Sequence, residues 1–259
     1  MPAELKSTTH GRTMVLTISN PEHRNALAPE MYAAGVEALN VAETNPEVRS
    51  VVITGEGAMF CAGGNLQRLQ SNRSQPPEVQ AQSIEGLHSW IEAIRTFPKP
   101  VIAAVEGPAA GAGFSLCLAC DLIVAAEDAF FVMAYVNVAL SPDGGATWHL
   151  ARMLPRHVAS EILIGGERIP ATRLHELGVV NRIAAPGTAL NDALAFAEKL
   201  NTKAPNAVAS IKELMNDAAD TTLNRQLAAE RDHFVRNLHH PNAGTGIEAF
   251  LAKKPPKYD

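Results

Sequence analysis

The sequence contains few cysteines, which limits the kinds of protein it can be. Only Cys61, Cys117 and Cys120 occur in 259 residues. Such a small, odd number does not support the disulfide framework of a small secreted domain. Cys117 and Cys120 form a Cys-x-x-Cys pair, but no second Cys or His cluster stands at metal-ligand spacing. We therefore expect a cytoplasmic protein with reduced thiols in a buried helix, and no metal or redox cofactor.

The sequence also lacks long apolar runs and an excess of positive charge. Glu106, Pro108 and Asp121 interrupt the most apolar stretch, residues 101–126, so it does not predict a membrane span. Residues 1–10 hold no apolar core of the kind found in secretory leaders. A formal net charge of −5 argues against a nucleic-acid partner. It does not exclude an anionic ligand, because a few local cations can hold a phosphate.

Strand-like and helix-like segments alternate in the first half of the chain, and helices dominate after Pro142. Strands are expected at 13–19, 48–54, 101–105, 122–125 and 179–183. Helices are expected at 29–45, 83–95, 144–153, 157–164, 189–200, 206–217 and 221–238, and a mobile surface loop at 71–77. The pattern predicts an α/β core over residues 1–200 and a helical C-terminal region over residues 201–259.

Two segments have the composition needed to present backbone amides to a ligand. Residues 59–66 read Met-Phe-Cys-Ala-Gly-Gly-Asn-Leu, and residues 107–116 read Gly-Pro-Ala-Ala-Gly-Ala-Gly-Phe-Ser-Leu. Small side chains let a ligand approach the main chain, and a following helix directs free N–H groups at negative charge. Tight packing of backbone against backbone would explain either segment alone.

Together, these segments resemble those of the enoyl-CoA hydratase/isomerase (crotonase) family. Further similarities lie at Asn-Pro-Glu-His-Arg-Asn-Ala-Leu (20–27), Lys-Pro-Val-Ile-Ala-Ala-Val-Glu-Gly (99–107), Ser-Pro-Asp-Gly-Gly-Ala-Thr-Trp (141–148) and Ala-Phe-Leu-Ala-Lys-Lys (249–254). The resemblance covers nearly the whole chain. It implies a crotonase-like (ClpP/crotonase) spiral of β-β-α units with a helical C-terminal trimerisation region, assembled as a homotrimer or a dimer of trimers. It also implies an acyl-CoA substrate, with coenzyme A entering only as part of that substrate.

The same resemblance assigns roles to individual residues. The backbone N–H groups of Gly64 and Ala112 would hold the thioester oxygen as it becomes an enolate, a charge that develops only in the transition state. The adenine end of coenzyme A would lie against the backbone near Ala62, Asn65 and Leu66, where Asn65 replaces the usual Asp. Either residue caps a helix well.

Three basic residues are implied to contact the phosphates of coenzyme A. They are His23 and Arg24 near the N-terminus and Lys253 near the C-terminus. Each could equally be a solvated surface charge.

The reaction depends on which carboxylates are present. Family hydratases use two glutamates, and the matching positions here hold Ser115 and Tyr135. Asp143, directly after Pro142, resembles the catalytic position of the family's isomerases, most closely those that act on 1,2-epoxyphenylacetyl-CoA in phenylacetate breakdown. We therefore expect Asp143 to move a proton along an acyl chain. As an alternative, Asp143 would cap the helix that follows it.

Other readings remain open from the sequence. One is an enoyl-CoA hydratase with different catalytic groups, and another is a non-catalytic acyl-CoA-binding protein. Ser115 lies in a near match to a nucleophile elbow that lacks the final glycine, which leaves a hydrolase as a further alternative. Tyr135 could close the acyl pocket, donate a hydrogen bond or pack in the core.

Overall fold

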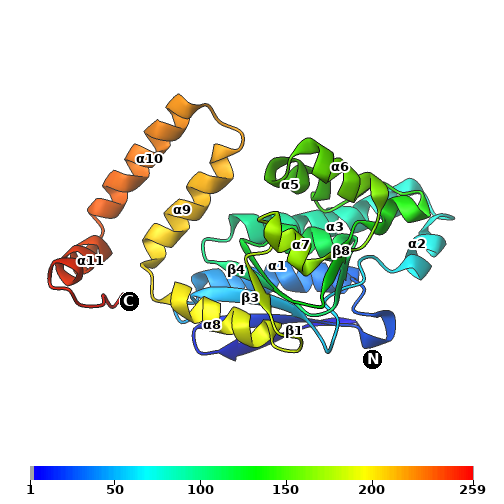
Figure 1. The fold of residues 1–259 in the computed structure, drawn as a ribbon, viewed down its shortest axis with the longest axis horizontal. Coiled ribbons are helices and arrows are strands. Elements are labelled where there is room, and N and C mark those ends of the chain that lie inside the picture. Colours follow the sequence, from blue (N-terminus) through cyan, green and yellow to red (C-terminus); the bar gives the residue numbers. More distant parts are fainter. Residues whose placement is uncertain (1–2, 259) are drawn as a thin grey trace.

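The protein is described by a computed structural model that covers residues 3–258. Within that range the chain forms two β-sheets and a set of helices that surround them (Figure 1). The six-stranded sheet has the order β1 (Glu4–His10), β2 (Thr13–Ser19), β3 (Ser50–Gly55), β4 (Val101–Val105), β6 (Leu122–Ala126) and β9 (Arg182–Ala184). The three-stranded sheet has the order β5 (Pro108–Ala110), β7 (Phe130–Val132) and β8 (Ile169–Pro170).

Helices connect and cover these strands. The α-helices of the core are α1 (Pro29–Thr44), α2 (Leu66–Asn72), α3 (Pro77–Thr96), α4 (Ala112–Ala119), α5 (Ala146–Met153), α6 (Arg156–Gly165), α7 (Ala171–Glu176) and α8 (Ala189–Asn201). Two short 3-10 helices are η1 (Pro21–His23) and η2 (Ala134–Val138). The C-terminal helices are α9 (Pro205–Ala218), α10 (Leu223–Leu238) and α11 (Pro241–Leu251).

The chain winds as a spiral because it passes from one sheet to the other in successive turns. Strands β4 and β6 pair in parallel in the large sheet, while β5 and β7, which follow them in sequence, pair in parallel in the small sheet. Parallel pairing requires a crossover between the strands. The β-β-α spiral implied by the family resemblance is therefore present.

Burial explains why these segments form the core. Every residue of β4 is buried, as expected for a parallel strand covered on both faces. On α8, Ala189, Ala193 and Ala197 recur at four-residue intervals and are completely buried, because this helical face lies against the large sheet.

The last three helices extend away from the core as an arm (Figure 1). Lys212, in the middle of α9, attaches this helix to the core: its ammonium donates to the Asp121 carboxylate at 2.7 Å and to the carbonyl of Ile94 at 2.9 Å. Several large apolar side chains of the arm are exposed, including Met215, Leu223, Phe234, Phe250 and Leu251. Phe250, for example, is 83% exposed.

Most expected elements are confirmed, with corrections at their ends. The loop expected at 71–77 is present but shorter, at 73–76, since α2 continues to Asn72 and α3 already begins at Pro77, whose fixed φ suits the first helical position. Strand β1 was not anticipated, because its side chains are mostly exposed and polar, as on an edge strand. No helix within residues 3–258 combines the length and apolar character needed to cross a membrane.

Candidate active site

Two asparagines shape the N-terminal loop that carries His23 and Arg24. The Asn25 amide donates to the carbonyls of Glu56 and Met59 at 2.9 and 2.8 Å, and the Asn20 amide donates to the carbonyl of Ala26 at 2.9 Å. Both asparagines are buried, so these bonds satisfy groups that cannot reach water. The loop is thereby held along the first amide-presenting segment.

The two amide-presenting segments lie side by side. Cys61 and Ala109 form a parallel bridge, in which the Ala110 N–H donates to the Cys61 carbonyl at 2.9 Å. A Cβ added to Gly63 would lie 2.6 Å from the carbonyl oxygen of Ala110 and 3.3 Å from the amide nitrogen of Ala112. Glycine is required at position 63, both for this approach and for its φ of +90°.

This contact brings the two expected oxyanion donors together. Gly64 follows Gly63 directly, and Ala112 is the first residue of α4, where an amide has no carbonyl partner inside its helix. Within residues 3–258, neither amide donates to a protein acceptor outside regular helix and strand pairing. The two N–H groups therefore remain available as hydrogen-bond donors.

A cavity of about 800 Å³ opens beside Gly64 and Ala110. Of the residues expected to contact coenzyme A or its thioester, six line it: His23, Arg24, Ala62, Gly64, Asn65 and Leu66. Asn65 caps α2 as expected, since its side-chain oxygen accepts from the amides of Gln67 and Arg68 at 2.9 and 3.1 Å. The cavity is therefore built around the segment that the sequence indicated.

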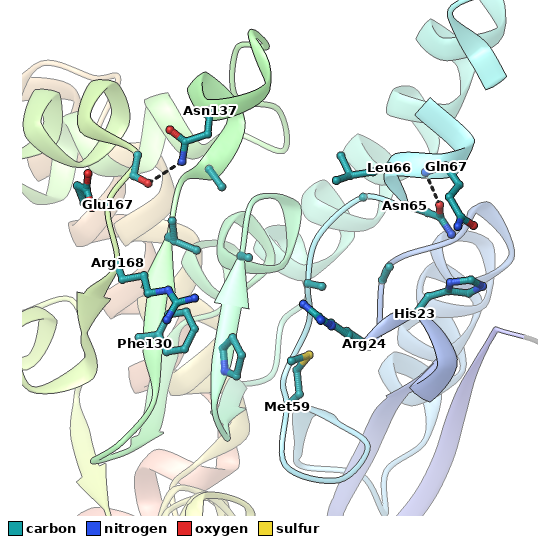
Figure 2. Close-up of a pocket in the computed structure, with 18 of the residues that line it drawn as sticks. His23, Arg24, Met59, Asn65, Leu66, Gln67, Phe130, Asn137, Glu167 and Arg168 are labelled. Atoms are coloured by element: carbon teal, nitrogen blue, oxygen red, sulfur yellow. Dashed lines mark hydrogen bonds between the residues drawn. The ribbon is translucent and has the colours of Figure 1, made fainter. Parts of the chain in front are cut away.

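The opposite wall of the cavity was not anticipated from the sequence. It includes Phe130 of β7, Asn137 of η2 and Arg168 of the loop before β8. The Arg168 guanidinium stacks on the Phe130 ring, 4.6 Å from its centroid. Figure 2 shows Arg168 and Arg24 pointing toward one another from opposite walls. An isolated Arg before a two-residue strand carries no motif, so only the fold reveals this second cation.

Asp143 forms a second group of expected residues together with Tyr135 and Ser115. Its carboxylate oxygen Oδ1 accepts a hydrogen bond of 2.5 Å from the Tyr135 hydroxyl. Its backbone carbonyl accepts from the Ser115 hydroxyl at 3.0 Å. The side chain of Asp143 does not cap α5, whose N-cap residue is Gly145. The alternative of a helix-capping role is therefore wrong.

The phenol of Tyr135 is a permanent donor in this arrangement. Burial, followed by the negative charge of Asp143, raises its pKa well above the usual range. The phenol consequently keeps its proton at neutral pH.

Lys253, His149, Cys117 and Cys120 do not line the cavity. Lys253 is exposed at the end of the arm and does not line the cavity of its own chain. Burial, followed by the charges of Arg95 and Arg152, lowers the pKa of His149 to about 4, which fits a neutral structural histidine. Cys117 and Cys120 are buried thiols whose pKa values are raised by burial. Within residues 3–258, no group of three His, Cys, Asp or Glu is arranged to hold a metal ion.

A β-β-α spiral that places two backbone amides together beside a cavity defines the crotonase class of fold. The enoyl-CoA hydratase/isomerase family model matches residues 8–259. The chain is 35% identical over 246 residues to 1,2-epoxyphenylacetyl-CoA isomerase of Escherichia coli K12, covering 95% of this chain and 94% of the relative. It is 31% identical over 256 residues to 2,3-dehydroadipyl-CoA hydratase of the same strain, covering 99% and 98%.

A solved structure supports the same assignment. The crystal structure of an enoyl-CoA hydratase from Polaromonas sp. JS666 is 70% identical to this chain and superposes with a TM-score of 0.98, covering 99% of this chain and 100% of that one. The protein belongs to the enoyl-CoA hydratase/isomerase family.

Proposed function

We propose that the protein is an enoyl-CoA isomerase that moves a double bond, or opens a ring, within an acyl-CoA thioester. The observation that carries this proposal is the position of Asp143. Its carboxylate is hydrogen-bonded to Tyr135, and the Tyr135 ring lies next to Gly111, the residue before Ala112. The two other side chains in this group, Ser115 and Tyr135, are neutral hydroxyls. One carboxylate suffices for a proton shift, because no water has to be activated.

In this proposal the thioester oxygen binds the amides of Gly64 and Ala112. Asp143 removes a proton beside the thioester, the two amides stabilise the enolate, and Asp143 returns the proton elsewhere on the acyl chain. Backbone dipoles fixed in advance stabilise the developing charge without reorganisation, and one such donor contributes on the order of 10²–10³ in rate.

Coenzyme A would occupy the cavity, with its phosphates between Arg24 and Arg168. Both guanidiniums line the cavity, and arginine suits phosphate because its planar fork donates two hydrogen bonds at once. Arg168→Met is therefore expected to raise KM for acyl-CoA about tenfold and to change kcat less than twofold. Steady-state kinetics measure both constants.

Arg182→Met serves as the matched control for Arg168→Met. Arg182 also stacks on an aromatic ring, that of Phe196 at 3.4 Å, but it does not line the cavity. Its substitution should leave KM unchanged. An unchanged KM in Arg168→Met would show that Arg168 does not bind the phosphates of coenzyme A.

We also propose that the arm assembles the chain into a homotrimer or a dimer of trimers. The exposed side chains of Phe250, Leu251 and Leu223 support this assembly, because apolar surface of this extent is normally covered by another chain. Lys253 would then act at the cavity of a neighbouring copy. A monomer in analytical ultracentrifugation would contradict this assembly.

Hydration is the second candidate, because the 70% identical Polaromonas protein is named an enoyl-CoA hydratase. The test is to incubate the purified protein separately with a 3-enoyl-CoA and with crotonyl-CoA, and to follow double-bond migration and water addition. We expect migration in the first assay and little hydration in the second. Rapid hydration of crotonyl-CoA without migration would overturn the isomerase proposal in favour of the hydratase.

A further inference from the structure

Tyr135 and Ser115, whose roles the sequence left open, both contact Asp143. We infer that they are positioning residues, which hold the Asp143 carboxylate in a fixed place relative to the oxyanion amide of Ala112. This inference rests on the isomerase function proposed above, and it assigns two further residues to that reaction.

The first contact fixes the carboxylate itself. Tyr135 belongs to η2, and its hydroxyl donates to Oδ1 of Asp143 at 2.5 Å. The other carboxylate oxygen, Oδ2, accepts no hydrogen bond from residues 3–258. The phenol therefore orients the carboxylate through one oxygen and leaves the other available for proton transfer.

The Tyr135 ring packs close to Gly111, in the segment 107–116 that presents the Ala112 amide. A Cβ added to Gly111 would lie 3.5 Å from Cζ and 3.7 Å from the hydroxyl oxygen of Tyr135, which is ordinary contact distance. Gly111 directly precedes Ala112, the residue that supplies the second amide. A shift of the phenol would consequently move the carboxylate relative to that amide.

The second contact fixes the backbone of Asp143. Ser115 is completely buried in α4, the helix that begins at Ala112, so its place relative to that amide is set by one helical turn. Its hydroxyl lies 3.0 Å from the Asp143 carbonyl and 3.3 Å from the Gly111 carbonyl. Contacts with Tyr135 and Ser115 thus fix both the side chain and the main chain of Asp143 relative to the start of α4.

Positioning of this kind affects turnover more than binding. Misplacing a reacting group by about 1 Å can cost up to about 10²-fold in rate. Neither Tyr135 nor Ser115 lines the cavity that would hold coenzyme A, so substrate affinity should not depend on them. A residue with a purely structural role would instead lower stability and leave kcat of the folded enzyme unchanged.

The test measures kcat and KM for migration of a 3-enoyl-CoA in Tyr135→Phe and Ser115→Ala, with thermal unfolding to confirm that each variant is folded. Tyr135→Phe removes one oxygen atom and is expected to lower kcat about tenfold or more, with KM changed less than twofold. Ser115→Ala should lower kcat in the same way but less, because it frees only the backbone contact. The two variants remove different hydroxyls, which contact different atoms of Asp143, so a folding defect in one does not remove the test.

Tyr32→Phe is the matched control. Tyr32 is also a buried tyrosine, and burial, with a smaller effect of the Asp143 charge, raises its pKa. Its hydroxyl lies near that carboxylate without the hydrogen bond that Tyr135 makes, so the variant tests the bond and not mere proximity. Its substitution should leave kcat within twofold of the natural protein.

Asp143→Asn separates the two ways in which the inference can fail. If Asp143→Asn abolishes migration but Tyr135→Phe and Ser115→Ala retain full kcat, the positioning inference is wrong and the isomerase function stands. If Asp143→Asn itself retains migration, the proposed function fails and there is no catalytic carboxylate to position. A change in KM without a change in kcat in Tyr135→Phe also overturns the inference.

Discussion

Asp143→Asn is expected to lower kcat for double-bond migration by about 10²–10⁴-fold, the contribution typical of a general base. The substitution removes the ability to take up a proton while retaining the size of the side chain. The amide oxygen of asparagine can still accept the hydrogen bond that Tyr135 donates to Oδ1, so the local geometry should survive. KM for the 3-enoyl-CoA should change little, because Arg24 and Arg168, which would bind the coenzyme A part of the substrate, are unaltered.

Two further variants sharpen this prediction. Asp128→Asn removes a carboxylate from an exposed turn and should leave kcat unchanged. Asp143→Glu keeps a base but moves it by one methylene, so we expect partial activity. Near-normal turnover in Asp143→Asn would show that another group moves the proton.

Ala112→Pro is expected to lower kcat by about 10²-fold or more, because it deletes one of the two oxyanion donors. Ala112 is the first residue of α4, a position where proline fits a helix well and where its missing N–H breaks no helical hydrogen bond. The preceding Gly111 has φ 49° and ψ −122°, the mirror image of the extended region that a residue before proline prefers, and glycine adopts it readily because it has no Cβ. The helix should therefore form as before.

Ala112→Gly is the control for this substitution. It retains the backbone N–H and changes only a buried methyl group, so kcat should stay within a few-fold of the natural protein. The comparison of the two variants by steady-state kinetics separates the donor from the side chain. If Ala112→Pro folds and keeps more than a tenth of kcat, the amide of Ala112 does not hold the reacting oxygen.

Much of the fold could be predicted from periodicity and from glycine and proline. The strands at 13–19 and 101–105 are apolar runs bounded by turn residues, and both occur where expected. Predictions failed where local signals are weak: β1 is a polar edge strand, and β8 has two residues. Strands of this kind are stabilised by pairing with a neighbour, which local sequence does not contain.

The residues of the site likewise fall into those that local sequence predicts and those that it does not. Gly64 and Asn65, in segment 59–66, line the cavity as the sequence indicated. Their positions depend on local backbone conformation, which small residues and helix-capping residues indicate directly. Arg168 was missed because its place in the cavity depends on β7 and β8 pairing, which brings it over Phe130. Lys253 was expected near coenzyme A, and in a single chain it lies on the arm instead.

The sequence by itself determined the family, the two amide-presenting segments and the single carboxylate at Asp143, because each of these is written in consecutive residues. Only the tertiary structure decided that Tyr135 and Ser115 both contact Asp143, and that Arg24 and Arg168 face the same cavity. Tyr135 precedes Asp143 by 8 positions, but Ser115 lies 28 positions from Asp143, and Arg24 and Arg168 come from opposite halves of the chain. The two distant pairs meet because the spiral returns its β-β-α turns to the same place, where long-range packing and not local propensity selects the neighbours.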